Sequence, residues 1–145
     1  MKAGDVIFVR GTSVISKIVR LFDRGQFSHV AIAVSDSEVI ETNWNMRSKI
    51  VPFHYKDYEV VSLNLSDSQR THIKNIASQY QGKLYDYLQV ISFLFWGRLN
   101  NPRHLICSEL VFNLLYDVGY LTDESLRDCT PNELYETLTE AIEKR

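Results

Sequence analysis

Residues 27–34 constrain the fold of this chain more than any other segment. They read Phe-Ser-His-Val-Ala-Ile-Ala-Val, a run of aromatic, β-branched and small residues that is typical of a β-strand. Because side chains alternate along a strand, His29 shares a face with Ala31, whereas Ile32 and the two valines lie on the other. Neither face is polar, so we expect a central strand that is covered on both sides.

Shorter strand-like runs flank this strand in the sequence. The polar residues 35–37 indicate a hairpin turn directly after it, and Pro52 is expected to end one of the later runs. The runs cover residues 6–9, 38–44, 49–51 and 58–65. Together they predict an antiparallel meander in the first half of the chain.

The second half of the chain is predicted to be helical. Ser66 and Gln69 form a capping-box pattern ahead of an apolar stripe that runs to Gly82. Pro131, with Thr130 before it, opens a last helix. Other apolar stripes at helical spacing cover residues 14–22, 85–96 and 107–118. Strands followed by helices indicate an α+β fold in which a small antiparallel sheet packs against helices.

Composition narrows the class of protein. A chain of 145 residues with 45% hydrophobic and 23% charged residues suits a single domain over residues 1–145. The net charge of -2 and the scattered basic residues give no reason to expect a nucleic-acid partner. The N-terminus lacks signal-peptide features, and the longest apolar run, residues 90–96, is too short for a transmembrane helix. We therefore predict a cytoplasmic protein.

The cysteines and histidines predict neither a disulfide framework nor a metal centre. Cys107 and Cys129 are the only cysteines, which fits a reducing compartment. The histidines, which show no ligand spacing with one another or with the cysteines, are His29, His54, His72 and His104. We expect no metal and no cofactor.

Cys107 is the candidate nucleophile. Apolar residues recur at helical spacing after it until Gly119, which places Cys107 in the first turn of the predicted helix. Unpaired backbone N–H groups and the positive end of the helix dipole favour thiolate over thiol there. The alternative is that this lone cysteine, beside Leu, Ile and Val, packs as a small buried hydrophobe.

His29 is the best candidate for the base that a cysteine nucleophile requires. It is the only histidine in the central strand, and the small Ala31 and Ala33 on its face leave room for a helix N-terminus or a ligand. A strand histidine can also be a satisfied core residue. His104, which is near Cys107 in sequence, is a second choice.

A third group must orient the histidine, and the length of the hairpin turn decides which residue is available. An odd-length turn places Glu41 and Asn43 on the face of His29. An even-length turn instead places Thr42 and Trp44 there. The sequence does not choose between these turns, although a glutamate inside a buried strand is unusual unless it has a partner. The alternative carboxylates are Asp5 and Glu109.

Acyl transfer also needs a second hydrogen-bond donor to the oxyanion, besides the backbone N–H of Cys107. Residues 82–87 precede a predicted helix and contain Tyr85 and Tyr87, either of which could be this donor. The alternative is that both are ordinary half-buried aromatic residues.

Five short motifs together resemble the circularly permuted, NlpC-like branch of the papain-type cysteine amidases, specifically its YiiX/YaeF-like group. The motifs are GDVIFVR at residues 4–10, FSHVAI at 27–32, VIE at 39–41, YDY at 85–87 and CSELV at 107–111. Their order covers nearly the whole chain. His29 precedes Cys107, as the permutation implies, whereas papain-like enzymes have the cysteine first.

This resemblance implies a permuted papain-like fold with the cysteine at a helix N-terminus. It implies Cys107 as nucleophile, His29 as base and Glu41 as the residue that orients the base. Tyr85 is carried over as the oxyanion donor. Family members are linked with hydrolysis of amide bonds in cell-wall peptides, and relatives in the wider superfamily act on lipid acyl groups.

We therefore predict a thiol hydrolase that forms an acyl-enzyme on Cys107 and cleaves an amide in a small peptide. One alternative is a lipid acyl hydrolase or acyltransferase, which the apolar residues 90–96 favour. Another is a catalytically inactive binding module of the same fold. The sequence predicts neither the oligomeric state nor the physiological substrate.

Overall fold

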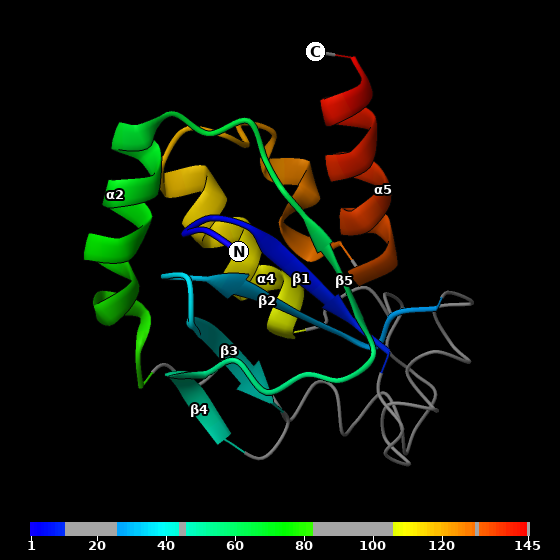
Figure 1. Ribbon diagram of the computed structural model, residues 1–145. Helices are drawn as coiled ribbons and strands as arrows, with labels where there is room; N and C mark the ends of the chain where they lie inside the picture. The colour runs from blue at the N-terminus through cyan, green and yellow to red at the C-terminus, as the bar shows by residue number, and fades with distance from the viewer. Residues whose placement is uncertain (11–25, 44–45, 83–105, 130, 145) are drawn as a thin grey trace.

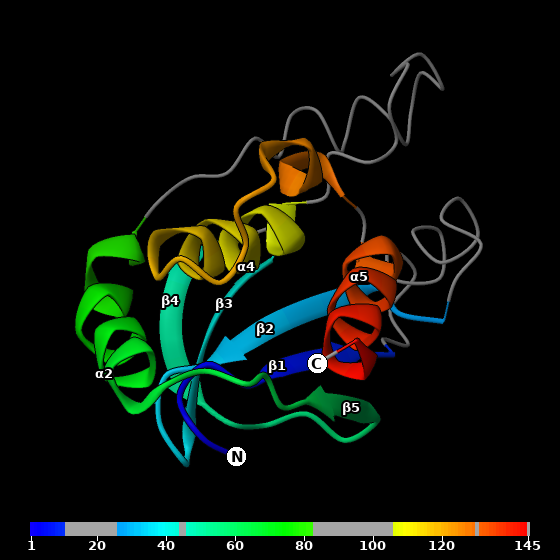
Figure 2. The same ribbon diagram turned by 90° about the horizontal axis from the view of Figure 1, so that it is seen from above.

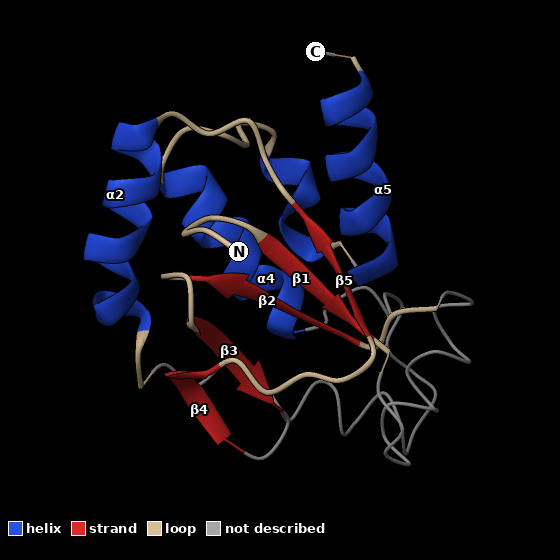
Figure 3. Cartoon of the chain, viewed as in Figure 1, coloured by secondary structure: helices blue, strands red, loops and turns tan. Residues whose placement is uncertain are grey.

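The computed structural model describes residues 1–10, 26–43, 46–82, 106–129 and 131–144 (Figure 1). Within these residues lie five β-strands, three α-helices and two short 3-10 helices (Figure 3). The strands are β1 (Val6–Val9), β2 (His29–Ala33), β3 (Glu38–Asn43), β4 (Met46–Pro52) and β5 (Tyr58–Val61). The helices are α2 (Asp67–Ile76), η1 (Ala77–Tyr80), α4 (Ile106–Asp117), η2 (Glu124–Asp128) and α5 (Pro131–Glu143).

The strands form one antiparallel sheet in the order β4-β3-β2-β1-β5. β2 is the central strand, as its two apolar faces predicted. The first four strands follow the predicted meander, but β5 returns to pair with β1 at the opposite edge. Residues 53–57 connect β4 to β5 and therefore cross the sheet. Figure 2 shows this connection on the side of the sheet away from α4.

Each face of the sheet carries its own apolar core, because side chains alternate along the strands. The first face packs against the three α-helices, with members such as Phe8, Ile32, Ile73, Leu114 and Leu134. The second face is covered by the connection of residues 53–57. Its members are Ile7, Val9, Ala31, Ala33 and Val39, and Val51 of β4 and Phe53 and Tyr55 of the connection pack against them. The connection thus takes the place of a helical layer on the second face.

Several element boundaries differ from the sequence prediction. β4 includes Pro52, which the sequence placed after the strand; an edge strand tolerates a residue without an N–H. β5 ends at Val61, short of the predicted end near Leu65. The capping box of Ser66 and Gln69 is confirmed, although α2 ends at Ile76 and the chain continues as η1.

Two predicted helices, over residues 14–22 and 85–96, lie outside the described residues. The last helix spans Pro131–Glu143, in agreement with the proline at its predicted first position. Within the described part of the chain, every helix is too short or too polar to cross a membrane.

Candidate active site

His29 is the first residue of β2 and lies beside the end of β1. It pairs with Val9, so its side chain is on the second face of the sheet and is 12% exposed. Ser28 N donates to Val9 O at 3.0 Å. The side-chain amide of Asn132 on α5 bonds both the N and the O of Phe27, at 3.0 and 2.9 Å. These bonds fix the backbone that leads into His29.

Glu41 lies on the same face as His29 because the β2–β3 turn has the odd length considered above. The two strands pair Ile32 with Ile40. Because the strands are antiparallel, Glu41, which follows Ile40, stands opposite Ala31, which precedes Ile32 and is on the histidine face. The register predicted for an odd-length turn is therefore confirmed, and the even-length alternative is wrong.

Glu41 is 3% exposed, and its carboxylate contacts three polar side chains. Oε2 lies 3.3 Å from Nε2 of His29 and accepts a hydrogen bond from the hydroxyl of Tyr55, while Oε1 lies 3.2 Å from Nε2 of His54. Burial by itself would raise the pKa of this carboxyl. The hydrogen bonds of His29 and Tyr55, the charge of His29 and the hydrogen bond of His54 outweigh burial and lower the pKa from 4.5 to about 2. Glu41 is therefore a charged acceptor at neutral pH.

The sequence did not point to His54 or Tyr55 as site residues, and His54 was considered only as a metal ligand. Both belong to the connection between β4 and β5, and they reach Glu41 because this connection crosses the second face of the sheet. The Tyr55 ring lies beside those of Phe53 and His29, with centroids 5.5 and 5.7 Å away. Three consecutive rings after a strand, at residues 53–55, are the sequence signal for a loop that covers an apolar face.

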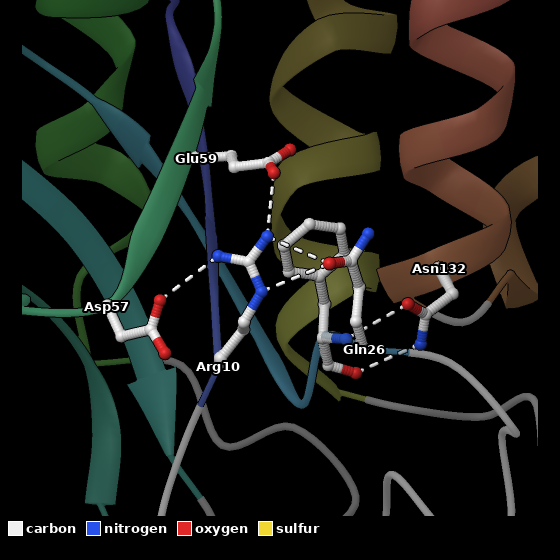
Figure 4. A network of polar contacts seen from close by, with 6 residues as sticks. Arg10, Gln26, Asp57, Glu59 and Asn132 are labelled. Carbon is white, nitrogen blue, oxygen red and sulfur yellow. Dashed lines mark hydrogen bonds and ion pairs between the residues drawn. The ribbon is translucent and has the colours of Figure 1, made fainter.

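A second polar network closes this end of the sheet (Figure 4). Arg10, directly after β1, forms ion pairs with Asp57 at 3.0 Å and Glu59 at 2.6 Å. It also donates to Oε1 of Gln26 at 3.0 and 2.8 Å. Its guanidinium carbon lies 4.9 Å from the centroid of the Phe27 ring. The network ties together the end of β1, the start of β5 and the chain that enters β2.

Cys107 belongs to α4, but its side chain lies outside the described part of the chain. α4 packs on the first face of the sheet, whereas His29 and Glu41 lie on the second. Groups on opposite faces can meet only past the end of a strand. Figures 1 and 2 show the beginning of α4 directed toward the end of the sheet where β2 starts and β3 finishes. Proximity of Cys107 to His29 stays a prediction.

The remaining candidates fall in different places. Tyr85 and His104 lie outside the described residues, as does the side chain of Asn43. Asp5 is at the opposite end of β1 from His29, and its buried carboxylate accepts from Lys2 N at 2.8 Å and Arg70 Nη1 at 3.2 Å. Asp5 is thus a structural anchor. Glu109 is half-buried on α4.

Comparisons with known proteins bear on the fold. A scan against protein-family models gave no match, and neither did a search of curated proteins. A search of solved structures matched five chains. One is the crystal structure of the metalloprotein yiiX (DUF1105) from Escherichia coli O157:H7, with a TM-score of 0.55, 23% sequence identity, and coverage of 83% of this chain and 67% of that chain. The likeness shows a YiiX-like α+β fold. The permuted papain-like arrangement stays a prediction.

Proposed function

We propose that this protein is a thiol hydrolase in which Cys107 is the nucleophile and His29 the base. The observation that carries the proposal is the buried contact of 3.3 Å between Nε2 of His29 and the charged carboxylate of Glu41. A carboxylate in this position fixes the orientation of an imidazole and stabilises the imidazolium that forms when the ring takes a proton. The YiiX-like fold and the order of the five motifs support the same assignment.

Nε2 of His29 contacts the carboxylate of Glu41, so we assign Nδ1 of His29 as the atom that takes the proton from Sγ of Cys107. The thiolate attacks the carbonyl carbon of an amide, and the tetrahedral intermediate collapses as the imidazolium gives its proton to the leaving amine. A thioester remains on Cys107. Water, deprotonated by His29, then attacks this thioester, releasing the acid and restoring the thiol. Tyr85 is the proposed second donor to the oxyanion in both steps.

The proposed substrate class is a small peptide with an accessible amide, and cell-wall peptides are the first to test. The solved relative is described as a metalloprotein. In the part of this chain that the structure describes, no three His, Cys, Asp or Glu side chains are grouped to hold a metal ion. Both oxygens of Glu41 already contact other side chains. The proposed steps use the protein's own side chains.

Formation of an acyl-enzyme tests the proposal. The full chain is incubated with an amide, an ester and a thioester of the same acyl group, and both leaving-group release and intact mass are followed. We expect turnover of the amide and an acyl adduct that maps to Cys107, with both abolished in Cys107→Ala. Cys129→Ala is the matched control. Cys129 is the other cysteine of the chain and is buried, so a substrate should not reach it, and the variant should keep the rate within about twofold.

The amide, ester and thioester substrates also distinguish an amidase from an acyl hydrolase. Turnover of the ester and thioester without the amide would make the protein an acyl hydrolase rather than an amidase. Absence of turnover and of any adduct on Cys107 would contradict a thiol hydrolase. Limiting iodoacetamide adds a test that needs no substrate, since a partly ionised Cys107 should be alkylated before Cys129.

A further inference from the structure

Tyr55 reaches both members of the His29–Glu41 pair. Its hydroxyl donates to Oε2 of Glu41 and lies 3.3 Å from Nε2 of His29, and the same Oε2 lies 3.3 Å from that Nε2. The three atoms thus form a closed triangle built from three separate segments, namely β2, β3 and the connection of residues 53–57. A hydroxyl at this point limits the movement of the carboxylate relative to the ring.

We propose that Tyr55 is a positioning residue for the thiol hydrolase reaction, acting on His29 through Glu41. The proposal rests on the proposed function. Tyr55 donates to the carboxylate oxygen that faces the imidazole, so it holds that oxygen where it can accept from Nε2. With Nε2 fixed, Nδ1 keeps one direction for exchange of the proton with the thiol.

The backbone around Tyr55 is tied down on both sides, which is what a positioning role requires. Phe53 N donates to Ser37 O at 2.9 Å, so the start of the connection is bound to the β2–β3 turn. Arg10 N donates to Asp57 O at 3.0 Å, and the two side chains form the ion pair shown in Figure 4. The place of the Tyr55 hydroxyl therefore follows from the sheet itself.

His54 is the weaker candidate for this role. It contacts the other oxygen of Glu41, at 3.2 Å, and its side chain is 53% exposed. A contact of this kind competes with water and is screened by salt. Tyr55, in contrast, contacts both His29 and Glu41 and packs its ring beside His29.

A double-mutant cycle on the full chain tests the proposal. The probe is iodoacetamide, and the readout is the second-order rate constant for alkylation of Cys107 at about pH 6.5, where an ordinary histidine is half-protonated. We expect Tyr55→Phe to lower this rate constant about fivefold, which is less than the full effect of a hydrogen bond to a charged carboxylate, because the hydroxyl acts on the thiol only through Glu41 and His29. Glu41→Gln should also lower it, and adding Tyr55→Phe to Glu41→Gln should bring no further decrease, because the hydroxyl acts through the carboxylate.

Tyr58→Phe is the matched control. It removes the same hydroxyl from a tyrosine that is 39% exposed and packs its ring on Phe53, 4.9 Å away, so the rate constant should not change. Near-ultraviolet circular dichroism confirms that each variant is folded. An unchanged rate in Tyr55→Phe, or the same fivefold decrease in the Glu41→Gln background, would overturn the positioning role. If wild-type Cys107 reacts no faster than Cys129, the proposed function itself fails, so the two failures are distinguishable.

Discussion

Glu41 is a carboxylate that the fold buries and yet keeps charged. A buried carboxylate without partners would become protonated, because desolvation of the charged form costs too much free energy. Here His29, Tyr55 and His54 supply the compensating hydrogen bonds. The charge that would stabilise a catalytic imidazolium also contributes to the stability of the folded state, and this contribution depends on pH.

Acid titration should reveal this contribution as a difference between the wild type and Glu41→Gln. The folded-state pKa of Glu41 is lowered from 4.5 to about 2, so its contribution is present above pH 4.5 and is lost as the pH falls toward 2. We expect the wild-type advantage in the free energy of unfolding to shrink by about 3 kcal/mol over that range. Urea denaturation at several pH values measures it. An advantage that stays constant down to pH 2 would show that Glu41 titrates as an ordinary carboxyl.

At the scale of elements, pairing between strands that are close in sequence could be predicted, whereas pairing between distant strands could not. The β2–β3 hairpin is local, so the parity of a short turn limited Glu41 to one of two faces, and the resemblance to the YiiX/YaeF-like group pointed to the face that the register confirms. The return of β5 to β1 is not local, and no strand pattern specifies which edge a later strand will join. For that reason His54 and Tyr55, which lie in the connection to β5, were missed.

A buried hydroxyl attaches α4 to a neighbouring segment, in addition to the apolar packing of the helix. Ser108 follows Cys107 in α4, is fully buried, and donates from Oγ to the carbonyl oxygen of Cys129 at 2.6 Å. This bond joins α4 to the segment between η2 and α5. It is therefore an attachment point for the part of the helix that carries the proposed nucleophile.

Ser108→Ala should loosen this attachment. Loss of a buried hydrogen bond is expected to reduce the free energy of unfolding by about 1–2 kcal/mol. Alkylation of Cys107 should slow as well, because its helix is held less firmly. Ser37→Ala, at an exposed turn position, is the control and should change stability by less than about 0.5 kcal/mol. Equal effects of the two substitutions in urea denaturation would show that the Ser108 hydroxyl does not fix α4.

At the scale of the whole molecule, the proposed nucleophile and the proposed base belong to elements on opposite faces of the sheet. α4 covers the first face, and the His29–Glu41 pair is embedded in the second. The sequence predicted the residue types and the strand face but not this division, because which face each layer covers depends on packing between distant segments. The proposed site thus needs the complete tertiary structure, and the isolated α4 segment should not show its reactivity.

Urea unfolding should make that dependence visible in the two cysteines. In the folded protein, Cys107 should react rapidly with iodoacetamide because the imidazolium of His29 stabilises its thiolate, whereas Cys129, 5% exposed, should be protected by burial. Unfolding removes both effects, so the two rate constants should converge on that of an ordinary exposed thiol. Both changes should occur in one step at the midpoint of the circular-dichroism transition. A Cys107 rate constant that stays high through this midpoint would mean that its reactivity arises from the neighbouring sequence alone, and His29 would then lose its role as the base.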